Sequence, residues 1–365
     1  GSANWSVIEK CNFTGEVHGI GQGNFGGIVG SASGVITDCT NAGVITGDDI
    51  ASVGGIAGDF TAASMGFSLD EETYPEEAAE VENIITSVKA LGVGIKNCTN
   101  VGDVTTALYD AGGIVGHVSD GLGYNYLDVM VIENCVNEGN VTSKDANWLS
   151  GNAGGICGVY ATESAILEEN RVEGSLMMKN CVNKGAVHSV GGTVAGILGS
   201  ASMQWGALTV DNCSNLGTLT IEETGGGHMS GFVGTVSTFE GVELRFENLT
   251  DETTYHVIKN CTAGGIVGSV VSAQSDEAEL SFIMKNCKGL GTYTIENPDE
   301  VLAGRYGALC GLFLEGIYVD DFQGTFEVID CEIPEGVPAV AQDGSLFEKA
   351  TNLIEIIKEE QEQQE

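Results

Sequence analysis

The residues that could catalyse a reaction in this chain are few and far apart. Neighbouring aspartates occur only at Asp48–Asp49 and Asp320–Asp321, and each pair lies in a predicted turn. Two carboxylates facing a glycosidic bond could hydrolyse it, and a basic group near a cation site would suit a lyase. The basic candidates are scattered and form no H-x-x-x-H pair: Arg171, Arg245, Arg305, His18, His117, His188, His228 and His256. The chain also lacks a G-x-S-x-G, Walker or dinucleotide motif in a strand–helix context. These residues predict no catalytic site.

Cysteine is the chemically reactive residue that recurs. Nine of the eleven cysteines follow an apolar pair and a short polar step: Cys11, Cys39, Cys98, Cys135, Cys181, Cys213, Cys261, Cys287 and Cys331. No C-x-x-C spacing occurs, which argues against a metal site. Disulfides are the closer alternative, but stacked parallel side chains hold Cβ atoms farther apart than the usual ~3.8 Å. We predict buried free thiols, and we expect no cofactor, with calcium in acidic loops as a lesser hypothesis.

Each cysteine belongs to a repeated pattern. Asn or Asp precedes it in eight of the nine copies, Asn recurs two places after it, and Gly four places after it. A second block of the form GGIxG follows at Gly26–Gly30, Gly54–Gly58, Gly112–Gly116 and Gly154–Gly158, with looser copies at Ala195–Gly199, Ser230–Gly234 and Gly307–Gly311. Short β-branched runs punctuated by Gly and Asn are typical of strands joined by sharp corners.

The repeat length defines the fold class. The closest cysteine spacings, 26 and 28 residues, are too short for a βαβ unit, and the core repeat has no helical period. We therefore predict an all-β parallel β-solenoid, a right-handed β-helix of about nine coils over residues 1–344. Stacked coils place like residues above one another at ~4.8 Å, which predicts ladders of Asn and Cys.

The coil around Cys261 fits two alignments. Gly264–Gly268 reads as a GGIxG block, or Gly265 and Val267 complete the cysteine block, which would leave that coil without its own GGIxG. The sequence leaves both alignments open.

The alternation of GGIVG with I-x-N-C-x-N-x-G-x-V resembles the GLUG-motif repeats of bacterial cell-surface proteins. The likeness runs from about Val7 to Gly311, although Ile usually replaces the Leu of that family and the repeated Cys departs from it. The resemblance implies a secreted, adhesin-like protein at the bacterial surface, and it transfers no active site.

Most length variation enters after GGIxG and before the next apolar-Asn-Cys step. The predicted insertions are Asp59–Gly94, His117–Val131, Val159–Met177, Ser200–Leu208, Thr235–Tyr255 and Ser269–Phe282. Insertions at one repeat position emerge along one edge, which is often the binding side. The first insertion predicts a helix that covers a flank or end of the solenoid, since Thr73 and Glu76 form a capping box and Val81, Ile84, Ile85 and Val88 share one face.

Aromatic residues collect in or near these insertions, and they are the candidate binding residues: Tyr124, Tyr126, Trp148, Tyr160, Trp205 and Tyr255. Exposed aromatic faces suit sugar rings or partner proteins. The alternative is that these side chains pack the loops onto the solenoid.

The C-terminal residues 345–365 predict a second helix. Ser345 and Glu348 form a capping box, and Leu346, Ala350, Leu353, Ile354 and Ile357 give an amphipathic pattern before a polar tail. We expect this helix to cap the open edge of the last coil.

Charge bounds the choice of partner. With 52 acidic and 14 basic residues the formal net charge is −38, which argues against nucleic acid or anionic membrane. No segment approaches the ~18 apolar residues of a membrane span. We expect a monomeric, extracellular, non-catalytic stalk or adhesion module for glycans or cell-surface proteins. A carbohydrate-active β-helix enzyme, a lyase or a hydrolase, is the alternative.

Overall fold

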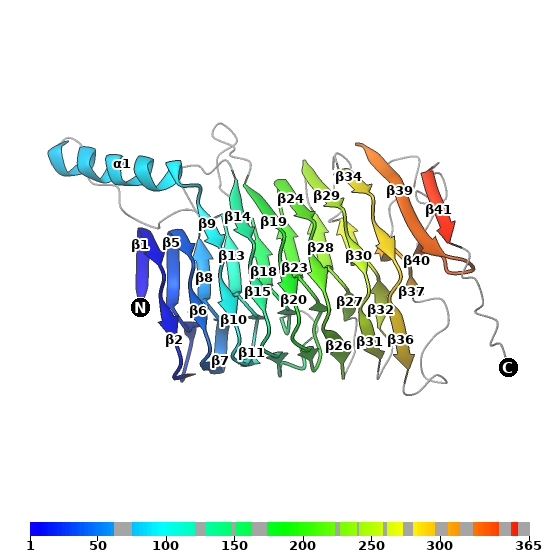
Figure 1. Ribbon diagram of the computed structural model, residues 1–365, viewed down its shortest axis with the longest axis horizontal. Coiled ribbons are helices and arrows are strands. Elements are labelled where there is room, and N and C mark those ends of the chain that lie inside the picture. Colours follow the sequence, from blue (N-terminus) through cyan, green and yellow to red (C-terminus); the bar gives the residue numbers. More distant parts are fainter. Residues whose placement is uncertain are drawn as a thin grey trace.

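The computed structural model is a parallel β-solenoid, in which each coil lies on the one before it along the longest axis (Figure 1). It describes residues 1–61, 75–120, 129–147, 150–162, 174–222, 227–238, 241–257, 261–272, 280–295, 306–313, 324–342 and 352–356. Every pairing between strands is parallel and in register with the repeat. The predicted fold class is therefore confirmed.

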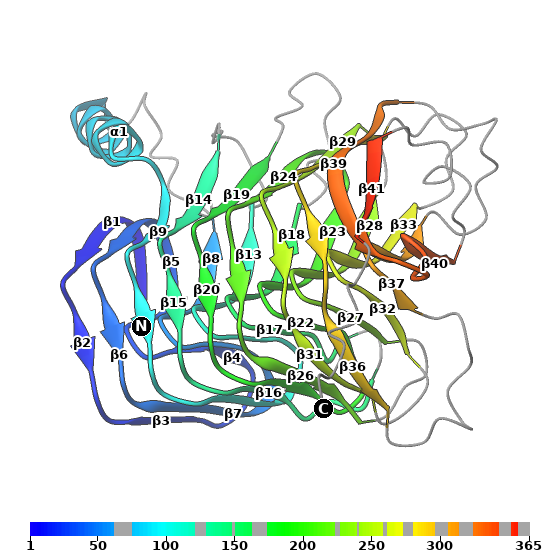
Figure 2. The ribbon, with the colours of Figure 1, turned by 45° about the vertical axis from the view of Figure 1, so that its right-hand side comes forward.

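Five stacks of strands build the solenoid, and Figure 2 shows their outline obliquely. Stack 1 precedes the corner before each cysteine: β1 Ser2–Glu9, β5 Val29–Thr37, β9 Gly94–Lys96, β14 Met130–Glu133, β19 Ser175–Lys179, β24 Gly206–Asp211, β29 Val242–Glu247, β34 Leu280–Lys285, β39 Phe326–Pro334 and β41 Asn352–Ile356. Stack 2 follows that corner: β2 Asn12–Phe13, β6 Thr40–Asn41, β10 Thr99–Asn100, β15 Val136–Asn137, β20 Val182–Asn183, β25 Ser214–Asn215, β30 Thr250–Asp251 and β35 Lys288–Gly289.

Stacks 3 and 4 form the far side of each coil. Stack 3 contains β3 Glu16–Gly19, β7 Val44–Gly54, β11 Val104–Leu108, β16 Val141–Ser143, β21 Val187–Ser189, β26 Thr218–Ile221, β31 Thr254–Val257 and β36 Thr292–Ile295. Stack 4 contains β4 Gly23–Gly26, the second half of β7, β12 Ala111–Gly112, β17 Ala153–Gly154, β22 Val194–Ala195, β27 His228–Ser230, β32 Thr262–Gly264 and β37 Tyr306–Gly307.

Stack 5 returns the chain to stack 1. It contains β8 Ala57–Thr61, β13 Val115–Ser119, β18 Cys157–Ala161, β23 Leu198–Met203, β28 Val233–Thr238, β33 Val267–Ser272, β38 Cys310–Phe313 and β40 Val340–Gln342. The strands β1 and β5 are long enough to contribute to both stack 5 and stack 1, so no loop separates these two stacks at β1 and β5.

The corner between stacks 1 and 2 explains the Asn or Asp before each cysteine. This residue adopts φ between +50° and +56° at Asp38, Asn97, Asn134, Asn180, Asn212, Asn248, Asn286 and Asp330. Asn and Asp tolerate this left-handed conformation better than other residues with a Cβ. Their exposed amides also bond between coils, each donating to the preceding coil, as Asn134 Nδ2 does to Asn97 Oδ1 at 3.1 Å.

The cysteines after this corner form the predicted ladder. The backbone of one coil bonds the cysteine carbonyl of the coil before it, as at Thr99 N–Cys39 O and Val136 N–Cys98 O. All eleven cysteines are free thiols and all but the half-exposed Cys11 are buried. Burial raises the pKa of Cys135 above its ordinary value, which keeps the thiol protonated. These observations agree with the prediction of buried free thiols.

Cys261 does not belong to this ladder. Asn248 occupies the corner of its coil and Leu249 takes the place of the cysteine, since the Lys288 amide donates to the Leu249 carbonyl. Gly264 pairs with Ser230 and Gly307, so Gly264–Gly268 is a GGIxG block. The count of nine stacked cysteines was therefore wrong, and eight are stacked.

A buried asparagine ladder separates two apolar cores. Asn41, Asn100, Asn137, Asn183 and Asn215 are almost fully buried. Each donates its Nδ2 to the next coil, at 2.7–2.8 Å between successive asparagines. One core lies among stacks 5, 1 and the cysteines, and the other lies between stacks 3 and 4.

The second position of GGIxG requires glycine because the backbone lies close to the asparagine ladder there. A Cβ on Gly113 would lie 2.3 Å from the Asn137 side chain and 2.1 Å from the Gly155 carbonyl oxygen. No side chain fits such a gap, so the repeated glycine lets the backbone close against the asparagine column.

One element packs at each end of the described solenoid. The helix α1, Pro75–Ala90, was predicted for the first insertion, and it contacts β1 and β5. Ile85 and Val88 of its predicted apolar face are buried, whereas Ile84 is exposed. The predicted C-terminal helix is wrong over Asn352–Ile356, which form strand β41 on β39. A strand satisfies the open N–H and C=O groups of β39 directly, and a helix cannot. The rest of 345–365 lies outside the described residues.

Candidate functional site

The predicted insertions share one corner of the coil, between the end of stack 5 and the start of stack 1, whereas the long β16–β17 and β36–β37 connections join stacks 3 and 4. We call this corner the insertion edge. The connections β8–β9, β13–β14, β18–β19, β28–β29, β33–β34 and β38–β39 all cross it. The prediction that insertions emerge along one edge is thus confirmed for the strands that flank them.

Two of the predicted insertions are shorter than their sequence boundaries. Between β23 and β24 only Gln204 and Trp205 connect the strands, so Ser200–Leu208 belongs almost entirely to the coil. Thr235–Tyr255 likewise contains β29 and β30 and the start of β31. The second error follows from treating Cys261, in place of Leu249, as the repeat origin.

The six candidate aromatic residues fall into three groups. Tyr124, Tyr126 and Trp148 lie outside the described residues. Trp205 is half-buried at the insertion edge. Tyr160 and Tyr255 are fully buried in the two cores, so the packing alternative holds for these two and neither presents a ring to solvent.

The asparagine ladder ends at Asp251, which occupies the asparagine position of its coil. Asn215 Nδ2 donates to Thr253 Oγ1 at 2.9 Å, and Thr253 N donates to Asp251 Oδ1 at 3.1 Å. The Tyr255 hydroxyl donates to Asp251 Oδ2 at 2.9 Å. Burial raises the pKa of the Asp251 carboxyl to about 7, although these donors favour its ionised form.

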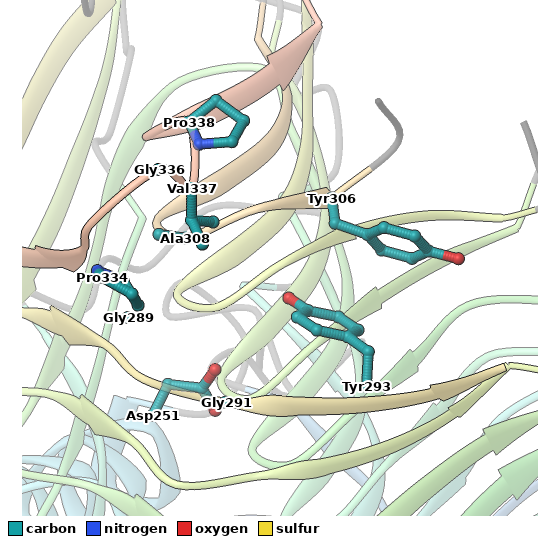
Figure 3. A pocket seen from close by; sticks show the side chains of 10 residues that line it. All are labelled: Asp251, Gly289, Gly291, Tyr293, Tyr306, Ala308, Pro334, Gly336, Val337 and Pro338. Atoms are coloured by element: carbon teal, nitrogen blue, oxygen red, sulfur yellow. The ribbon is translucent and has the colours of Figure 1, made fainter. Parts of the chain in front are cut away.

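A cavity of about 350 Å³ adjoins Asp251 (Figure 3). The next coil has Gly289 where five earlier coils have asparagine, and Tyr293 and Tyr306 form one wall. The two rings lie 4.8 Å apart, and Tyr293 stacks on Tyr255 at 4.5 Å. Figure 3 shows the Tyr293 hydroxyl directed toward the cavity and the Tyr306 hydroxyl directed away.

The opposite wall of the cavity is apolar. It is formed by Ala308 and by Pro334, Val337 and Pro338 of the turn between β39 and β40. Tyr293, Tyr306 and Val337 each keep partial exposure, so the cavity reaches the surface beside them. An apolar cavity with one buried carboxylate and two aromatic rings has the features of a small-molecule site.

The histidines and paired aspartates of the sequence analysis are spread over the surface. His18 contacts Asp48 at 2.6 Å, His117 contacts Asp59 at 3.0 Å and His188 contacts Glu222 at 3.1 Å. Asp320–Asp321 lies outside the described residues. Across the described ranges no group of three or more His, Cys, Asp or Glu side chains could hold a metal ion.

Within the same ranges no helix has the length and apolarity that crossing a membrane requires. Comparison of the chain with protein-family models, with curated proteins and with solved structures finds no match. What the structure defines is therefore a class, the parallel β-solenoid with insertions at one corner.

Sequence reasoning missed the cavity for an identifiable reason. Its signal was the substitution of Asp251 for Asn in one coil and of Gly289 for Asn in the next. Aligning the coil on Cys261 placed Asp251 in an insertion, so Gly289, two places after Cys287, was not seen to lie beside a second break in the ladder.

Proposed function

We propose that this chain is a non-catalytic β-solenoid of a bacterial surface protein, similar to the GLUG-motif repeats, that acts as a stalk or an adhesion module for glycans or proteins. The observation that carries the proposal is the insertion edge. Stacked strands hold the described ends of successive insertions in one row, which suits the display of variable segments to a large partner.

Charge and packing support the same proposal. A formal net charge of −38 keeps a protein soluble and disfavours nucleic acid and anionic lipid as partners. The cores and the asparagine ladder continue from coil to coil, so each coil is stabilised by its neighbours. Such a body suits a stalk as well as a binding scaffold, and an extracellular location fits both.

The structure indicates how to remove insertions without disturbing the coils. The β23–β24 connection needs only Gln204 and Trp205, and Thr162 and Gly174 mark the equivalent ends of the β18–β19 connection. Replacing residues 163–173 by two residues gives that connection the same length. Residues between Asp120 and Val129 can be shortened in the same way.

The test compares the full chain with this trimmed variant on glycan arrays and on cells. We expect the full chain on beads to bind one glycan class or one cell-surface protein, and the trimmed variant to lose at least tenfold in affinity while keeping its circular dichroism spectrum. Equal binding by both would refute adhesion through the two trimmed insertions. Absence of binding by the full chain would refute the adhesion form. Release of sugar fragments from a polysaccharide would refute the non-catalytic assignment.

A further inference from the structure

The asparagine ladder has a direction, and the cavity lies at the end toward which it points. Each buried asparagine donates its Nδ2 to the next coil, and the last donor, Asn215, is satisfied by Thr253. Beyond it, Asp251 is an acceptor, and Gly289 contributes no side chain. A ligand in the cavity therefore meets an acceptor at the position where the other coils supply an amide.

Among the described residues that line the cavity, the buried carboxylate has no positive partner. None of the ten lining residues is basic, and Asp251 is 1% exposed. Neutral donors from Thr253 and Tyr255 satisfy part of its bonding capacity, but they do not cancel its charge. A buried carboxylate is costly until a cation pairs with it.

The remaining walls suit the apolar part of such a cation. The parts of the Tyr293 and Tyr306 rings that line the cavity, together with Ala308, Val337 and Pro338, offer apolar contact. A volume of about 350 Å³ is near the lower end for small-molecule pockets, which limits the ligand to a small one. The strongly negative chain also raises the local concentration of cations.

We propose that this cavity binds a small organic cation, with its ammonium group on Asp251 and its apolar body against Tyr293 and Tyr306. The site lies among stacks 2, 3 and 4, whereas the insertion edge joins stacks 5 and 1. The proposal goes beyond adhesion and does not rest on it.

Binding depends on pH through the Asp251 carboxyl, and other titratable groups lie around the cavity. These are Tyr255 beneath Asp251, Tyr293 and Tyr306 above it, and Cys261, which acts on Tyr293. Glu335, on the β39–β40 turn, is exposed. The Lys288 ammonium forms an ion pair with Glu332 at 2.9 Å.

The cation binds the ionised carboxylate, whose folded-state pKa is about 7. The ionised fraction is about 0.9 at pH 8 and about 0.1 at pH 6, so affinity rises about tenfold between pH 6 and pH 8.

The experiment uses the full chain and a matched pair of probes. Benzylammonium and benzyl alcohol share ring and shape and differ in charge, and calorimetry or ligand-observed NMR measures their binding at pH 6 and pH 8. Asp251→Asn removes the charge and introduces the asparagine that forms the ladder in earlier coils. Val337→Phe places a larger side chain in the cavity from the β39–β40 turn. Asp110→Asn is the control, because Asp110 is a second buried carboxyl with pKa about 7 and does not line the cavity.

We expect benzylammonium to bind at pH 8, about tenfold more weakly at pH 6, and at least tenfold more weakly to Asp251→Asn and Val337→Phe. Asp110→Asn should bind as the unmodified chain does, and benzyl alcohol at least tenfold more weakly. The proposal is overturned by equal binding of the two probes, by unchanged binding to folded Asp251→Asn, or by no saturable binding of benzylammonium below about 10 mM. The variant with trimmed insertions should still bind benzylammonium, which separates this result from the fate of the adhesion proposal.

Discussion

Replacing Asp251 by Asn should stabilise the protein, and the gain should grow with pH. The folded-state pKa of this carboxyl is about 7, against an ordinary value of 3.8. Its contribution to stability is therefore fully present below pH 4 and is lost as pH rises through 7. Asparagine is similar in shape to the protonated acid and does not ionise, so the variant avoids this loss.

The expected size follows from the two pKa values. Linkage gives a cost of ionisation of about 2 kcal/mol at pH 5.5 and about 4 kcal/mol at pH 8.5. The variant loses some of this gain because the Tyr255 hydroxyl, now a donor to Asp251, must accept a bond from the new amide. That loss does not depend on pH. The difference of about 2 kcal/mol between the two pH values is therefore the quantity to measure.

Urea denaturation followed by far-UV circular dichroism measures this difference. The free energies of unfolding of the variant and of the unmodified chain are compared at both pH values. Asp103→Asn is the surface control, because Asp103 is exposed and its Oδ1 accepts a bond from the Asn140 amide, as an amide oxygen can too. We expect the control to shift by less than about 0.5 kcal/mol at either pH. A stability difference for Asp251→Asn that is the same at pH 5.5 and pH 8.5 would show that the buried carboxyl does not titrate with a raised pKa.

Two further predictions concern the ladders. In the native protein a thiol reagent should modify Cys11 alone among the cysteines within minutes and all eleven after denaturation, because ten are buried; early reaction of several thiols would contradict the buried cysteine column. Asn137→Ala should lower the free energy of unfolding by about 2 kcal/mol, because the variant loses the hydrogen bond to Asn183 and leaves the Asn100 amide without its acceptor. Asn134→Gly should change the free energy of unfolding by under about 1 kcal/mol, because glycine adopts the left-handed corner freely. Equal losses in a denaturation experiment would mean that the buried amides do not stabilise the coil stack.

The sequence predicted the fold because the repeat carries physical information at almost every position. The second glycine of GGIxG, the asparagine two places after the cysteine and the left-handed residue before the cysteine each have one structural reason, and successive coils repeat these reasons. Leu249 shows where the approach fails. A leucine fills the cysteine position as well as a thiol does, so the coil keeps its shape while losing the residue that marks it.

The prediction of a C-terminal helix was wrong for a different reason. Leu353, Ile354 and Ile357 match a helical period, and the segment Asn352–Ile356 is also a short apolar run with two β-branched residues, which suits a strand. Local pattern does not decide between the two, and the unpaired edge of β39 does. The cavity could not be predicted at all without the corrected alignment, because it arises from what two neighbouring coils lack.

The two amide columns described above run in opposite senses along the molecule. The buried asparagines donate toward the C-terminal end, whereas the exposed asparagines at the corner donate toward the N-terminal end. The side-chain dipoles of the two columns therefore oppose each other, and partial charge does not accumulate at either end as coils are added. Whole coils can therefore be added without electrostatic cost from the side-chain ladders. The length of such a solenoid then depends on the number of coils in its sequence.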